Sequence, residues 1–157
     1  MMGIGTGIRT GRRLSLIMIL LAALGLVDSL YLTAIKLANA TAACAGIGNC
    51  DAVNSSRYSE IGGVPIALFG AAAYAAVGAM VILEGRVKER RQALHLGVFG
   101  LTLAGSLYSA YLTYVEVAVL RAICPYCVVS AILMTALFGL SILLLREGDE
   151  NAVEGGD

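Results

Sequence analysis

Four long apolar segments dominate the chain, and short polar connections separate them. They cover residues 14–35, 61–83, 92–115 and 122–145, and each is 22 to 24 residues long. A helix needs about 20 apolar residues to cross the hydrocarbon core of a bilayer. None of the four segments alternates between apolar and polar residues with the period of two that a membrane-barrel strand requires. The pattern predicts an all-α integral membrane protein, a bundle of four transmembrane helices.

The polar segments divide the rest of the chain. Residues 1–13 precede the membrane domain of residues 14–145, and the acidic tail at 146–157 is expected to be disordered. Ala38 to Ala40 resembles a signal-peptide cleavage site. The preceding apolar run is longer than the core of about 7–15 residues in a signal peptide, so we expect this run to remain as a membrane helix.

The basic residues predict the orientation of the bundle. Arginines gather at 9–13, and further basic residues lie at 86–91, between the second and third helices. The connections on the other side, at 37–64 and around 121, carry fewer. Loops rich in Lys and Arg stay in the cytoplasm. We therefore expect a plasma-membrane protein with both termini in the cytoplasm.

Composition agrees with a membrane protein and excludes other classes. The chain is 59% apolar and 14% charged, with a net charge of zero. Soluble domains are about 45–50% apolar and about 25% charged. A nucleic-acid-binding protein, a disordered chain and a small secreted disulfide knot are all excluded by these values.

In the outward loop, residues 49–60 predict a short helix outside the membrane, capped by Asn49 or Asp51, that could cover a site like a lid.

All four cysteines fall on the outward side. Cys44 and Cys50 lie in the first outer loop, and Cys124 and Cys127 form the motif CPYC at the start of the fourth helix. Thiols one helical turn apart can close a disulfide with little rearrangement, and a helix N-terminus stabilises a thiolate. A thiolate is the species that attacks disulfides, and compartments outside the cytoplasm tolerate them. The pattern favours an oxidoreductase with a dithiol relay.

Other interpretations of the cysteines stay open. They could form structural disulfides, hold zinc through four thiolates, or be incidental packing residues in a small four-helix transporter. A scaffold that only binds a partner through its outer loop is a further alternative. The spacing of Cys44 and Cys50 is wider than the usual zinc knuckle, so no metal site is expected. A CPYC motif at a helix start favours the relay over the transporter, which has no reason to carry one.

Several motifs occur together in a specific order. They are GLVDSLY at 25–31, DAVNSSRY at 51–58 after the loop cysteines, GGVPIALFGAAAY at 62–74 and CPYC at 124–127. In this order they resemble the vitamin K epoxide reductase family in its bacterial and archaeal form. The resemblance covers roughly residues 22–145, nearly all of the predicted membrane domain.

The resemblance implies a mechanism. A reduced thioredoxin-like (DsbA-like) extracytoplasmic protein would deliver electrons to a disulfide between Cys44 and Cys50. One of these loop cysteines would then attack a disulfide between Cys124 and Cys127. Cys127 would reduce a quinone, either ubiquinone or menaquinone, held among the four helices, with Ser56 near the quinone head. The net result would be disulfide formation in extracytoplasmic proteins at the expense of the quinone pool.

Some positions depart from other members of the family. Ala131 and Ile66 stand where animal members that reduce the epoxide have Tyr and Asn. Both differences remove polar contacts to a quinone oxygen, so quinone reduction is expected rather than epoxide reduction. Many bacterial relatives carry a fused thioredoxin-like domain. These 157 residues do not include one, so a separate partner protein is expected.

Polar residues in the predicted spans complete the candidate site. Asp28 lies within the first apolar segment, where an acid is costly and often serves a polar cavity or a proton route. Together with Tyr111 it is expected to contribute to the quinone site, although a neutral hydrogen-bonded acid and an aromatic belt at the membrane interface are the alternatives. We expect Glu116 to be solvated near the outer interface and His95 to lie at the inner one.

Overall fold

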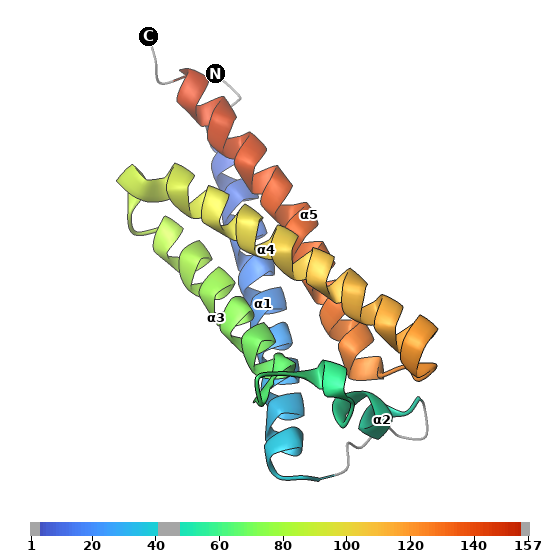
Figure 1. Cartoon of the computed structure of the whole chain (residues 1–157). Helices are drawn as coiled ribbons and strands as arrows, with labels where there is room; N and C mark the ends of the chain where they lie inside the picture. The colour runs from blue at the N-terminus through green and yellow to red at the C-terminus, as the bar shows by residue number, and fades with distance from the viewer. Residues whose placement is uncertain (1–3, 41–47, 155–157) are drawn as a thin grey trace.

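The structure is a computed structural model, and it describes residues 4–40 and 48–154 (Figure 1). Four long helices run side by side, and a small outer segment joins the first two of them. The long helices are α1 (Ile4–Leu37), α3 (Ile66–Glu84), α4 (Arg91–Tyr114), which continues as the π-helix η3 (Val115–Leu120), and α5 (Pro125–Glu154).

Each long helix contains a stretch that is long and apolar enough to cross a membrane. These stretches are Gly11–Leu37, Ile66–Glu84, Arg91–Leu120 and Pro125–Arg146. The predicted bundle of four spanning helices is therefore confirmed. α1 packs against α3 and α5, while α4 packs against α5 and α3. The four helices thus enclose a common interior.

Tyr74 of α3 lies across this interior and is almost completely buried. Its ring contacts α1 at Gly25, where an added Cβ atom would clash with the ring. Its hydroxyl donates a hydrogen bond of 2.7 Å to the carbonyl oxygen of Ser130 on α5. One side chain therefore joins α1, α3 and α5 within the outer half of the bundle.

The outer segment contains short elements at the end of the bundle opposite to the first turn of α1 (Figure 1). They are the helix α2 (Cys50–Asn54), the 3-10 turn η1 (Arg57–Ser59) and the strands β1 (Glu60–Ile61) and β2 (Val64–Pro65). The side chain of Asn49 caps α2 by accepting a hydrogen bond of 3.2 Å from the Ala52 amide. The predicted short helix is present with Asn49 as its cap, but it ends at Asn54 and not at residue 60, because the chain turns at Ser55 and continues as η1 and β1.

The two strands pair antiparallel and meet at Gly62 and Gly63, whose φ angles are +60° and +84°. Glycine adopts such left-handed angles without a steric cost, so these two residues suit a tight hairpin turn. The hairpin takes up residues 60–65, and for this reason the second membrane helix begins at Ile66 and not at residue 61.

His95 lies one turn into α4, at the inner end of the bundle, and is buried between the helices. Its Nε2 lies 2.9 Å from a carboxylate oxygen of Glu84, and Arg91 contacts the same oxygen at 3.0 Å. Buried charged groups are tolerated when they are paired. α5 continues as a helix to Glu154, where disorder was expected after Arg146. No proline interrupts this stretch, so the existing helix can propagate through it.

Candidate functional site

A cavity of about 210 Å³ lies among the four long helices at their outer ends, next to α2. Most of its lining is apolar, and the polar groups in it are few. Every long helix and the outer segment contribute, through residues that include Ser29, Ser56, Tyr74, Tyr108, Glu116, Cys124, Cys127 and Met134. A mostly apolar pocket with a few convergent polar groups is the usual form of a small-molecule site.

Cys124 and Cys127 lie at this cavity, at the N-terminus of α5. Both are free thiols; Cys124 is fully buried and Cys127 is half-buried. A hydrogen bond from the Cys127 thiol lowers the pKa of Cys124, and hydrogen bonds from the backbone amides of Cys127 and Tyr126 add to this effect. Pro125 occupies the first turn, where a missing N–H has no cost. Cys124 is thus the cysteine whose thiolate this helix N-terminus stabilises.

The outer loop is docked directly on the CPYC motif. The Asn49 amide donates a hydrogen bond of 3.0 Å to the Ile123 carbonyl oxygen. Gly48, with φ of +84°, permits this approach, because an added Cβ would clash with the same carbonyl oxygen. Cys50 follows, is held in a disulfide and is buried in one cluster with Val53 and Cys124. A disulfide-bonded loop cysteine therefore packs beside the first cysteine of the motif.

The fourth predicted cysteine, Cys44, lies outside the described residues. Ser56, in contrast, is described and lines the cavity. Its hydroxyl donates a hydrogen bond of 2.7 Å to the Val53 carbonyl oxygen, which leaves its lone pairs available to another donor. The structure thus brings Ser56, Cys124 and Cys127 together around one cavity.

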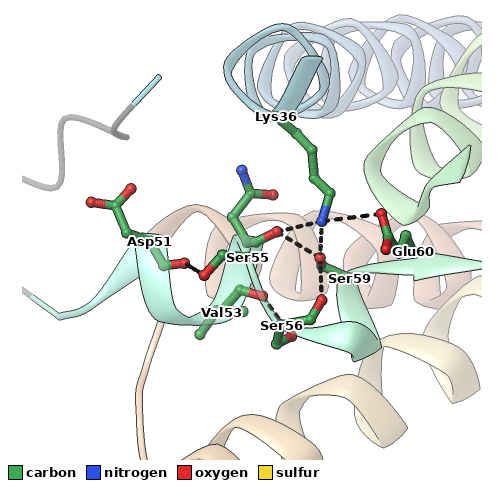
Figure 2. Close-up of polar contacts among 8 residues, drawn as sticks. Lys36, Asp51, Val53, Ser55, Ser56, Ser59 and Glu60 are labelled. Atoms are coloured by element: carbon green, nitrogen blue, oxygen red, sulfur yellow. Dashed lines mark hydrogen bonds and ion pairs between the residues drawn. The ribbon is translucent and has the colours of Figure 1, made fainter. Parts of the chain in front are cut away.

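The outer segment is fixed over the cavity by Lys36 at the end of α1 (Figure 2). The Lys36 amine donates a hydrogen bond of 2.6 Å to the Asn54 carbonyl oxygen and another to the Ser59 hydroxyl. It also lies 3.7 Å from a carboxylate oxygen of Glu60. Ser59 in turn hydrogen-bonds the carbonyl oxygen of Ser56, at 2.7 Å. A single lysine on α1 therefore positions the segment that carries Ser56.

Two residues expected at the quinone site do not line the cavity. Asp28 is absent from the lining, and its buried Oδ2 receives no hydrogen bond from the described residues. Tyr111 is 51% exposed on the outside of α4, whereas Tyr108 lines the cavity in its place. Neighbouring positions on a helix differ by about 100° in direction, so Ser29 faces the cavity and Asp28 does not.

Glu116 is a site residue that the sequence analysis missed. It was expected to be solvated, but it is 4% exposed and lines the cavity. Its Oε2 accepts a hydrogen bond of 3.2 Å from the Cys124 amide, and the carboxylate also hydrogen-bonds the Cys127 thiol. Glu116 lies in the π-helix η3, and Arg121 then turns the chain back with φ of +49°. This local geometry, which no sequence signal predicted, aims the carboxylate at the start of α5.

Comparisons with known proteins agree with this architecture. The sequence model of the vitamin K epoxide reductase family matches residues 16–142. The chain is also 34% identical over 123 residues to the thiol-disulfide oxidoreductase LTO1 of Arabidopsis thaliana, an alignment that covers 74% of this chain. The same alignment covers 33% of LTO1, so the chain spans about a third of the length of that relative. The matched residues include most of the four long helices and both pairs of cysteines, so the chain belongs to the vitamin K epoxide reductase family.

Proposed function

We propose that the protein is a membrane thiol oxidoreductase that passes electrons from an extracytoplasmic dithiol protein to a quinone. The observation that carries the proposal is the contact between its cysteines. Disulfide-bonded Cys50 packs beside Cys124, and Cys124 hydrogen-bonds Cys127 at an apolar cavity. Permanent structural disulfides would leave no reason for two free thiols in contact at a helix N-terminus.

The proposed route begins at the outer loop. A thioredoxin-like (DsbA-like) partner would reduce the disulfide of Cys50, for which Cys44 is the proposed second cysteine. The reduced loop would transfer its electrons by thiol–disulfide exchange to an oxidised pair of Cys124 and Cys127. Exchange requires a thiolate and an accessible neighbouring sulfur, and the packing of Cys50 on Cys124 supplies the contact between the pairs.

The last step uses the cavity. Its apolar lining suits a quinone ring, and Tyr108 and Ser130 carry hydroxyls that could donate hydrogen bonds to the quinone oxygens. Ser56 could do the same once its hydroxyl turns away from the Val53 carbonyl oxygen. A bound quinone, ubiquinone or menaquinone, supplies the oxidising power by taking up two electrons and two protons. Cys127 lines the same cavity and is the proposed donor to it. In the proposed orientation, in the plasma membrane with cytoplasmic termini, both cysteine pairs face the outer compartment, where secreted proteins acquire disulfides.

Four cysteine variants and two electron donors test the route. Cys44→Ala and Cys50→Ala are expected to block oxidation of a thioredoxin-like partner but to retain much of the quinone reduction driven by dithiothreitol. Cys124→Ala and Cys127→Ala are expected to abolish both reactions, since no dithiol then remains at the cavity. Thr135→Ala, on the exposed face of α5, is the control. Quinone reduction by Cys127→Ala at nearly the wild-type rate would contradict the proposed order.

A further inference from the structure

Glu116 places a buried carboxyl group beside the two thiols of the CPYC motif. Glu116 is 4% exposed, and burying an ionisable group in an apolar cavity costs free energy unless it is well paired. Its described partners are the Cys124 amide and the Cys127 thiol. A structural role alone, as an acceptor for the amide of Cys124 just before α5, would be served equally well by a neutral glutamine or serine side chain.

Among the described residues that line the cavity, Glu116 is the side chain best suited to accept a proton. No Lys, Arg, His or second acidic residue appears among the described residues that line it. The tyrosines that do line it are Tyr58 from the outer segment, Tyr74 from α3 and Tyr108 from α4. Phenols have an ordinary pKa of about 10 and are poor proton acceptors as neutral groups. A carboxylate can accept a proton near neutral pH.

We propose that Glu116 is a catalytic residue that accepts the proton of the Cys127 thiol and returns it to the reduced quinone. This assignment rests on the proposed function. In the complete reaction two S–H bonds are lost, one S–S bond forms between Cys124 and Cys127, and two electrons pass to the quinone. One of the two protons travels through Glu116. The other is released by Cys124, and the hydroquinone takes up its equivalent from the outer solvent, so Glu116 ends as the carboxylate with which it began.

The Glu116 carboxylate interacts with the Cys127 thiol and is held at this place by its hydrogen bond of 3.2 Å from the Cys124 amide, so a proton acceptor lies beside the thiol. The Cys127 thiol has one proton and two neighbours, Cys124 and the Glu116 carboxylate, and only the carboxylate can hold that proton once the disulfide forms. Both groups also line the cavity, so a proton on Glu116 is on the side from which a quinone oxygen would collect it. Proton transfer by a positioned side chain typically accelerates a reaction by about 10²- to 10⁴-fold.

The test compares Glu116→Gln with the wild type in quinone reduction driven by dithiothreitol, from pH 6 to pH 10. Glutamine keeps an acceptor for the Cys124 amide but cannot take the thiol proton. The expected loss is about 100-fold or more near pH 7. The loss should shrink toward pH 10, because hydroxide can then take the thiol proton in place of the missing carboxylate. Glu84→Gln is the matched control, since it removes a carboxylate that is 5% exposed at the other end of the bundle.

Each outcome decides between the roles. A Glu116→Gln rate like that of the wild type, or a loss that is the same at every pH, would overturn the proton-transfer role and leave Glu116 as a helix cap. Glu116→Asp retains a proton acceptor and should lie between the wild type and Glu116→Gln; an Asp variant slower than the Gln variant would also contradict the proposal. A wild-type protein that reduces no quinone would instead overturn the proposed function itself.

Discussion

Replacing Lys36 by Met should loosen the outer segment without disturbing the membrane helices. The substitution keeps the length of the side chain but removes every polar contact of the amine shown in Figure 2. The hydrogen bond to the Asn54 carbonyl oxygen is charged and short, at 2.6 Å, and the amine side chain is 15% exposed. A hydrogen bond to a charged group contributes about 1.5–3 kcal/mol.

The contact with Glu60 adds little. It is 3.7 Å long, and the Glu60 side chain is 45% exposed, so solvent screening limits its contribution to at most about 1 kcal/mol. Water can replace part of the lost contact with Asn54, which favours the lower half of the range. A total of about 2 kcal/mol changes the opening equilibrium of the segment about 30-fold.

Hydrogen exchange measures this opening directly. The amides of Val53, Ser55 and Ser59 are hydrogen-bonded within the segment and exchange when it opens. In Lys36→Met they should exchange about 30-fold faster, while peptides from α3 stay unchanged. Glu60→Gln, which removes only the long ion pair, should accelerate the same amides no more than about fivefold. Equal exchange in Lys36→Met and wild type, or faster exchange throughout α3, would refute the role of Lys36 as the anchor of the segment.

Three further predictions concern the cavity and the cysteines. Gly48→Ala places a Cβ against the Ile123 carbonyl oxygen at a left-handed φ, so it should undock the loop from the CPYC motif. Electron transfer from the protein partner should then be slower than in the wild type, while the rate with dithiothreitol is unchanged. A variant that matches the wild type with both donors would contradict the docking. Ser56→Ala should slow quinone reduction about two- to tenfold, the value of one neutral hydrogen bond, and an unchanged rate at saturating quinone would leave Ser56 as a turn residue. Ultraviolet absorbance of the reduced protein follows the thiolate of Cys124, which should appear at a pH below the ordinary thiol pKa of about 8.5. Cys127→Ala removes the main hydrogen bond to this sulfur, so it should raise the pKa of Cys124. The same titration curve in both proteins would contradict that cause.

The spanning helices and the outer helix were predictable from the sequence because their causes are local. Long uncharged runs determine where a chain can cross a bilayer, and Asn49, a residue type that favours the N-cap position, indicates the start of α2. The position of CPYC at a helix start followed from the same pattern. These features depend on neighbours along the chain.

The wall of the cavity was not predictable, because it depends on rotation and on contacts between distant segments. The spanning helices are apolar on nearly every face, so the sequence does not reveal which face turns inward. Asp28 and Tyr111 were assigned to the site, yet Ser29 and Tyr108 line it. Glu116 was missed because the π-helix and the left-handed turn at Arg121 have no recognised sequence signal.

The most direct test of electron transfer from the CPYC cysteines to quinone is one turnover of the purified, reduced protein with quinone in the absence of any other donor. Cys124 and Cys127 are both free thiols in the structure, and two such thiols hold the two electrons that one quinone accepts. One hydroquinone is expected to form for each disulfide, and mass spectrometry after alkylation is expected to find Cys124 joined to Cys127. Hydroquinone formation with both cysteines still free, or no hydroquinone at all, would contradict this route.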